Sequence, residues 1–131
     1  RQCDNALELA RFLQGLGGDI EVNYPGLEKS PYHEIAEKQF RNGYGAIVTV
    51  RTGSKEKAFS IINSLKIPLI ISNIGDTKTL VIHPESTIAA HISDEEKLQS
   101  GVFEDLIRIS VGIEDIEDLK EDFKQAIENN R

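Results

Sequence analysis

Short β-branched segments alternate with amphipathic helical segments along the 131 residues, and this alternation restricts the chain to the α/β class. Apolar residues recur at helical spacing over 4–16, 31–40, 55–65, 94–101 and 115–127, and strands are predicted over 20–22, 46–50, 68–71, 80–83 and 106–111. Several connections are short, which favours a mixed sheet over a strictly parallel one. We therefore predict one domain over residues 1–131, an α/β (α+β) sandwich in which helices cover mainly one face of a small mixed sheet.

Residues typical of helix ends mark these boundaries. Gly15-Leu16-Gly17-Gly18 predicts the end of the first helix. It resembles part of a dinucleotide-binding loop, but it follows a helix instead of a strand, so a cap is the favoured interpretation. Ser30-Pro31 is typical of an N-cap followed by proline at the first helical position, and Ser93 to Glu96 predicts a capping box.

Composition excludes several classes of function. A net charge of −7 argues against binding to nucleic acid or to an anionic membrane surface. The longest apolar run, Ile67 to Ile71, is too short to cross a bilayer. The single Cys3 excludes an internal disulfide and suits the cytoplasm. The chain has no Met and begins with Arg1, so we expect it to be part of a longer protein.

No metal site is predicted, because His33, His83 and His91 lack ligand spacing with each other or with Cys3. His33 is expected to face solvent, and His83, at the end of a strand, is expected to have a structural or site-rim role. The acidic residues of the last helical segment predict a solvated face favoured by the helix dipole: Glu114, Asp115, Glu117, Asp118, Glu121 and Asp122.

Arg108 is the residue that most clearly suggests a functional role. Strand alternation would place Leu106, Arg108 and Ser110 on one face. A charged group between apolar neighbours needs a partner. An internal salt bridge and a fork for a ligand carboxylate explain it equally well from spacing alone. The polar loop from Ser72 to Asp76 follows an apolar strand and reads as a plain turn or as a ligand-binding loop.

Two long motifs resemble those of the Cys/Met-metabolism PLP-dependent enzymes. Asn73 to Thr87 resembles the family segment N-x-G-D-x-K-S/T-L-V-x-H-P-x-S-T, and Leu106 to Asp115 resembles L-I-R-L/I-S-V-G-I/L-E-D. Upstream, Val22 to Leu27 and Gly43 to Ala46 also resemble these enzymes. The resemblance covers nearly the whole chain. The Asn73 loop is similar to the O-acetylhomoserine sulfhydrylase branch, whereas the cystathionine synthase and lyase branches usually read S-L-G-G there.

The resemblance implies a PLP fold type I (aspartate-aminotransferase-like) enzyme in which this chain is the small C-terminal domain. Pyridoxal 5'-phosphate would be bound by a lysine of an N-terminal domain that this chain lacks, since Lys66 and Lys78 match other positions. The resemblance assigns Arg108 and Asn73 to the substrate α-carboxylate, with Ser72 and His83 at the site rim. It assigns no catalytic residue to this chain. It also implies that the first helix packs on the missing domain, so that its apolar surface would be exposed here.

The implied activity is transfer of the homoserine carbon chain from O-acetylhomoserine to sulfide or a thiol, giving homocysteine and methionine precursors. The implied parent enzyme is a cytoplasmic homo-oligomer, a tetramer, and the isolated chain is expected to be inactive. The chain departs from the family at Glu85, Ile88 and Ala89, near the substrate entrance. Two alternatives stay open: a free-standing, non-catalytic binding or assembly module, and a degenerate paralogue, which rests on Glu85 and Ala89. The sulfur donor and the acyl group are not fixed by the sequence.

Overall fold

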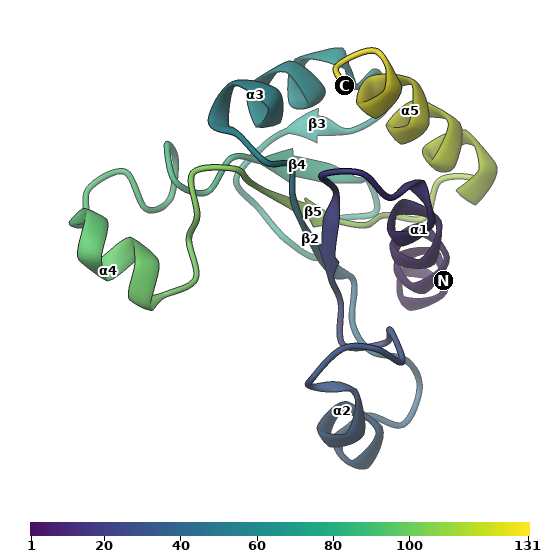
Figure 1. Ribbon diagram of the computed structural model, residues 1–131. Helices are drawn as coiled ribbons and strands as arrows, with labels where there is room; N and C mark the ends of the chain where they lie inside the picture. The colour runs from purple at the N-terminus through teal and green to yellow at the C-terminus, as the bar shows by residue number, and fades with distance from the viewer.

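The computed structural model describes all 131 residues and contains five helices and five strands (Figure 1). In chain order they are α1 (Gln2–Leu16), β1 (Glu21–Asn23), α2 (His33–Gln39), β2 (Ile47–Arg51), α3 (Lys55–Ser64), β3 (Leu69–Ile70), β4 (Leu80–Ile82), α4 (Asp94–Gln99), β5 (Leu106–Ser110) and α5 (Ile116–Glu128). All ten predicted elements are present, and their bounds differ from the prediction by two residues at most. None of the helices is both long and apolar enough to cross a membrane.

The five strands form one sheet in the order β1-β2-β5-β4-β3. The β3–β4 pair is parallel and the other three pairs are antiparallel. The predicted mixed sheet is therefore confirmed. In the central register, Arg108 of β5 lies opposite Thr49 of β2 on one side and Ile82 of β4 on the other.

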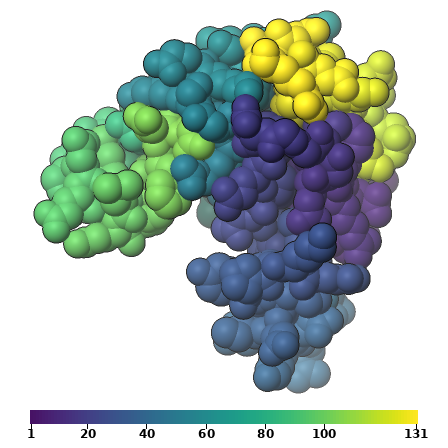
Figure 2. Space-filling view, viewed as in Figure 1, coloured from purple at the N-terminus to yellow at the C-terminus, as the bar shows by residue number.

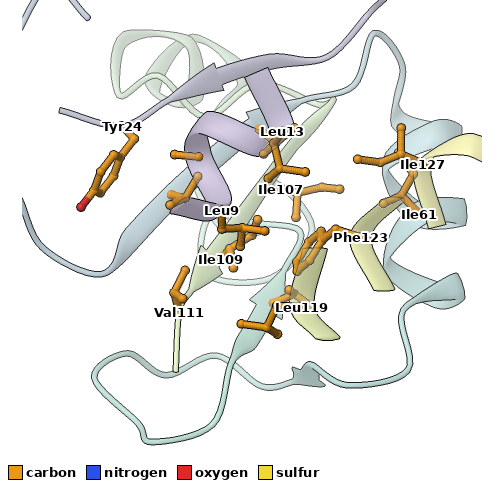
Figure 3. Close-up of a cluster of buried hydrophobic side chains, with 14 of the residues drawn as sticks. Leu9, Leu13, Tyr24, Ile61, Ile107, Ile109, Val111, Leu119, Phe123 and Ile127 are labelled. Atoms are coloured by element: carbon orange, nitrogen blue, oxygen red, sulfur yellow. The ribbon is translucent and has the colours of Figure 1, made fainter. Parts of the chain in front are cut away.

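Helices α1, α3 and α5 cover one face of the sheet and enclose the core (Figure 3). Ile107 and Ile109 of β5 point into this core and are almost fully buried, together with Leu9, Leu13 and Phe123. Alternation along the strand sends Leu106, Arg108 and Ser110 to the opposite face. We call that face, which the three helices leave uncovered, the open face.

Helix α1 does not expose its apolar surface, which corrects the expectation drawn from the family resemblance. Ala6, Leu9, Ala10 and Leu13 are 0% exposed, because they pack against the sheet and against α5. Burial of each large aliphatic side chain stabilises the fold by roughly 1.5–3 kcal/mol. The apolar residues of α1 are therefore buried by contacts within this chain.

Two lobes project from the helix-covered body, one containing α2 and one containing α4 (Figures 1 and 2). Helix α4 has the predicted capping box between Ser93 and Glu96. Helix α2 begins at His33, two residues later than predicted. The Ser30 hydroxyl accepts the N–H of Tyr32, and the Ser30 carbonyl accepts that of His33. Ser30 and Pro31 thus form a turn before the helix.

His33 is mostly buried, which corrects its expected exposure. Its Nδ1 lies 2.9 Å from the carbonyl oxygen of Pro25, and its ring centroid lies 5.5 Å from that of Tyr44. On the other side, Nε2 lies 3.4 Å from a carboxylate oxygen of Glu37. The imidazole therefore ties α2 to the turn that precedes it.

Asp122 departs from the predicted solvated acidic face of α5. It is only 5% exposed, and its carboxylate accepts the backbone N–H groups of Lys66 and Ile67 at 2.8–3.1 Å. These amides follow the end of α3, in the segment between α3 and β3. Asp122 therefore joins α5 to the segment between α3 and β3.

Candidate functional site

Arg108 lies on the open face with no acidic partner. It takes part in none of the ion pairs of the structure, and no carboxylate oxygen lies within 4.0 Å of its guanidinium nitrogens. Its one hydrogen bond is a long one, from Nη2 to the backbone carbonyl oxygen of Asn73 at 3.4 Å. A guanidinium has five N–H donors, so most of the donors of Arg108 remain free. An internal salt bridge is not the arrangement found.

A cleft of about 660 Å³ opens beside Arg108, between the α2 lobe and the α4 lobe. Its floor is the open face, including Asn23, Thr49 and Arg108, and its walls include Tyr32 before α2 and Ile88 before α4. The space-filling view shows a hollow between the two lobes (Figure 2). The side chain that lacks a charge partner therefore lies where a small molecule can reach it.

Arg51 is the other cation in this cleft, and its charge is already compensated. Its Nε lies 3.0 Å from Oδ1 of Asp105, and its guanidinium carbon lies 4.1 Å from the ring centroid of Phe103. Burial by itself would raise the pKa of Asp105, but the hydrogen bonds from Arg51 and from the N–H of Gly53 outweigh it and lower that pKa. Arg108 is thus the one cation of the cleft available to an anion.

The structure brings Asn73 together with Arg108. Asn73 is exposed, and its Oδ1 accepts the backbone N–H of Ile74 at 2.9 Å. A backbone N–H can only donate, so the side-chain oxygen must face it, and the Nδ2 group keeps its two donors free. Ser72 is exposed at the start of the same loop. The free donors of Arg108 line the cleft, and the backbone of the loop that carries Asn73 is bonded to the same guanidinium.

His83 lies away from this place. It is 3% exposed, with Nδ1 2.8 Å from the Ser86 hydroxyl and Nε2 2.6 Å from the carbonyl oxygen of Glu104. Its ring also packs on Phe59, at 4.5 Å between centroids. Both ring nitrogens are already bonded. The geometry supports the structural role for His83 and gives no support to the predicted site-rim role.

The departure from the family pattern at Glu85 has a local structural explanation. Its carboxylate lies 2.7 Å from Nζ of Lys55 in α3 and 2.9 Å from Nζ of Lys97 in α4. These two hydrogen-bonded ammonium groups lower the pKa of Glu85 to about 2. Ala89 is buried, so of the three departures only Ile88 lines the cleft beside Arg108. Glu85 binds the α4 lobe to the body of the domain.

Ser110, Thr79 and Glu114 hold the Asn73 loop against β5. Sequence reasoning gave Ser110 only a place on the face of Arg108, and it wrongly assigned Glu114 to the solvated acidic face. The Ser110 hydroxyl accepts the N–H of Gly75 at 3.1 Å, and Thr79 donates twice to the carboxylate of Glu114. The strand alternation that places Ser110 on the face of Arg108 was a signal for the first contact. No sequence pattern predicts the second.

This arrangement is suited to binding a carboxylate. A guanidinium donates two parallel hydrogen bonds to a carboxylate, and such charge-assisted bonds are about twice as strong as neutral ones. The amide of Asn73 adds neutral donors beside the fork. No group of three or more His, Cys, Asp or Glu side chains is arranged to hold a metal ion.

Known proteins similar to this chain act in sulfur amino-acid metabolism. The chain is 42% identical over 129 residues to homocysteine synthase of Schizosaccharomyces pombe, which covers 98% of the chain and 30% of that protein. It is also 42% identical over 128 residues to O-acetyl-L-homoserine sulfhydrylase 1 of Thermus thermophilus, covering 97% of the chain and 30% of that protein. The chain thus spans about 30% of the length of these relatives.

Solved structures of similar enzymes contain the same fold as this chain. A candidate O-acetylhomoserine (thiol)-lyase of Campylobacter jejuni, solved with N'-pyridoxyl-lysine-5'-monophosphate, matches with a TM-score of 0.92 and 37% identity. It covers 97% of this chain, which spans 30% of that one. Cystathionine gamma-lyase of yeast matches with a TM-score of 0.92 and 35% identity, covering 97% of this chain and 33% of that one. The predicted fold, that of a domain of PLP fold type I enzymes, is confirmed.

The residues of this chain do not fit covalent attachment of PLP at the cleft. The cofactor is held as an imine on a lysine in enzymes that use it, and no lysine lines the cleft beside Arg108. Lys55, Lys57, Lys97 and Lys120 are engaged in ion pairs elsewhere. The cleft therefore offers N–H donors that can bind a carboxylate, but no lysine to which the cofactor could be attached.

The family itself is shown by the extent of the match. The family model of Cys/Met metabolism PLP-dependent enzymes matches residues 1–128. The match includes β5 with Arg108 and the Asn73 loop, and the relatives and solved structures named above agree with it. The chain therefore belongs to the Cys/Met metabolism PLP-dependent enzyme family.

Proposed function

We propose that this chain is the substrate-carboxylate-binding, C-terminal domain of a longer PLP-dependent enzyme of the O-acetylhomoserine sulfhydrylase type. The observation that carries the proposal is the guanidinium of Arg108, which has no acidic partner, lines an open cleft and donates to the backbone carbonyl of Asn73. The names of the similar proteins support the substrate class. PLP would be bound by a lysine of another part of the longer protein.

The role proposed for Arg108 and Asn73 is orientation. Arg108 would bind the α-carboxylate of O-acetylhomoserine through its fork, and the Nδ2 group of Asn73 would donate to the same carboxylate. Two contacts to one end of the substrate fix the direction of its Cα–H bond. Bound PLP supplies an electron sink for carbanion chemistry at that carbon. Neither residue moves a proton.

Sulfide or a thiol would then replace acetate, giving homocysteine or a thioether. The isolated chain would be inactive, because it lacks the lysine for PLP. A cytoplasmic, homo-oligomeric parent acting on small molecules belongs to the same proposal and rests on the family alone. The salt bridges of Glu85 favour an intact enzyme over a degenerate paralogue, because they explain this departure by stability.

Substitution of Arg108 in the PLP-loaded longer protein tests the proposal. Arg108→Ala is expected to raise the KM for O-acetylhomoserine about 30-fold or more, since removing one partner of a hydrogen-bonded charge pair costs about 2–5 kcal/mol. Arg108→Lys keeps the charge without the fork, and a smaller increase of about tenfold is expected. The measurement is homocysteine formation at varied substrate concentration.

Arg11→Ala is a matched control, because Arg11 is exposed on α1 on the helical side of the sheet. Calorimetric binding of an unreactive L-amino acid and of the corresponding amine without a carboxylate gives a second measurement. Arg108→Ala should weaken binding of the amino acid and leave binding of the amine unchanged. Equal KM values for wild type and Arg108→Ala would refute the proposed role.

A further inference from the structure

The position of Asn73 depends on a loop with little structure of its own. Residues 71–78 are all exposed, and no helix or strand extends over the segment from Ser72 to Thr79. Gly75 turns the chain with a φ of +75°. Such a loop samples many conformations unless other residues hold it. The contacts that fix its course therefore decide whether Asn73 remains beside Arg108.

Ser110 supplies a contact from β5 to the loop close to Asn73. It lies two residues after Arg108 on the same face of β5, and it is 1% exposed. Its Oγ accepts the backbone N–H of Gly75 at 3.1 Å. This bond holds the peptide two residues beyond Asn73 directly on the strand that carries Arg108. Strand β5 therefore carries Arg108 and, through Ser110, also holds the loop that carries Asn73.

Glu114 holds the other end of the loop. Its two carboxylate oxygens accept the backbone N–H and the hydroxyl of Thr79 at 2.8 and 2.9 Å. The Thr79 hydroxyl in turn accepts the N–H of Gly112 at 2.9 Å. Asn5 of α1 donates to the carbonyl oxygen of Glu114 at 2.8 Å, which fixes the segment after β5.

We infer that Ser110 and Glu114 are positioning residues for substrate binding, which keep the Asn73 loop in register with Arg108. The inference rests on the proposed function. Neither residue is expected to touch the substrate, because the hydroxyl of Ser110 is buried and the carboxylate of Glu114 is occupied by Thr79. Their effect reaches the ligand through Gly75 and Asn73.

Ser110→Ala in the PLP-loaded longer protein is the first test. Loss of the acceptor for Gly75 is expected to raise the KM for the amino-acid substrate about five- to tenfold, with kcat within about twofold of wild type. Ser110→Thr retains the hydroxyl and should restore KM. Ser60→Ala, on the exposed side of α3, is the matched control and should leave KM unchanged.

Hydrogen exchange of the 72–79 segment gives a readout other than activity. Ser110→Ala should accelerate exchange at Gly75, while core segments such as β5 and α5 remain protected. Glu114→Ala should accelerate exchange at Thr79 and raise KM, and Glu114→Gln, which retains one oxygen acceptor, should do so less. These two variants test the same inference if Ser110→Ala folds poorly.

Comparison with Arg108→Ala separates the two proposals. If Arg108→Ala raises KM while Ser110→Ala and Glu114→Ala leave both KM and exchange unchanged, the positioning role is wrong and the proposed function stands. If Arg108→Ala has no effect on KM, the proposed function fails and the positioning role fails with it. The expected result is an increase in KM for all three variants, largest for Arg108→Ala.

Discussion

Nη2 of Arg108 lies 3.4 Å from the backbone carbonyl oxygen of Asn73, so strand β5 and the 72–79 loop meet at these two residues. The Asn73 side-chain oxygen accepts the N–H of Ile74, which leaves the two donors of its Nδ2 group free. Both side chains therefore have more N–H donors than the protein satisfies. A carboxylate satisfies both side chains at once.

Asn73→Asp should reverse this complementarity. A carboxylate at position 73 would pair with Arg108 and repel the carboxylate of the substrate, and like charges brought together cost several kcal/mol. We expect the KM for O-acetylhomoserine in the PLP-loaded longer protein to rise at least about tenfold, and more than in Asn73→Ser. The thermal midpoint should change little, because Asn73 is exposed.

Asn42→Asp is the matched control for this substitution. Asn42 is also exposed and lies in the turn between α2 and β2. It introduces the same charge without placing it beside Arg108. If Asn73→Asp bound the substrate as tightly as Asn42→Asp, the amide of Asn73 would have no part in carboxylate binding.

The open face and its arginine were predictable from the sequence because they follow from local periodicity. Alternation along residues 106–111 predicted Arg108 on the other face of the sheet from Ile107 and Ile109, and the structure has this arrangement. Helix caps were equally local, as at Ser93, which forms the predicted capping box with Glu96. Side chains within three or four residues of one another determine these features.

The contacts that join distant segments were not predictable in this way. Asp122 was assigned to a solvated acidic face, but it accepts amides 55 and 56 positions away in the chain. Glu85 was seen only as a departure from the family pattern, and its lysine partners lie in two different helices. Helical periodicity does not say which carboxylate meets which backbone once the sheet has formed.

Glu85 should make the stability of the domain depend on pH in acid. Lys55 and Lys97 lower its pKa to about 2 in the folded chain, whereas a free glutamate has a pKa near 4.5. A group with a depressed pKa in the folded state contributes its stability above the pKa of the unfolded state. That contribution is lost as the pH falls from about 4.5 towards 2.

Glu85→Gln is expected to remove this dependence. It should lower the free energy of unfolding at pH 7 by roughly 1–3 kcal/mol, because Lys97, which is largely buried, loses its partner. Urea denaturation between pH 2 and pH 7 measures both effects, with the exposed Glu121→Gln as control. Parallel acid profiles for wild type and Glu85→Gln would show that these ion pairs do not hold the α4 lobe.

Asp122 provides a stability test on the helical side of the sheet. Its carboxylate accepts the N–H groups of Lys66 and Ile67 and the side-chain amide of Gln125. Asp122→Ala would leave these donors without an acceptor. A buried donor left unsatisfied costs about 1–3 kcal/mol, so we expect the free energy of unfolding to fall by roughly 2–4 kcal/mol.

The substitution Asp122→Asn separates hydrogen bonding from charge. It retains one oxygen acceptor, so its loss of stability in urea denaturation should lie between those of Asp122→Ala and the exposed control Glu121→Ala. Hydrogen exchange at Lys66 and Ile67 should follow the same order, since these amides are the groups that Asp122 protects. A loss in Asp122→Ala no greater than in Glu121→Ala would mean that water or a rearranged loop satisfies both amides, and the link between α5 and the chain after α3 would then be dispensable.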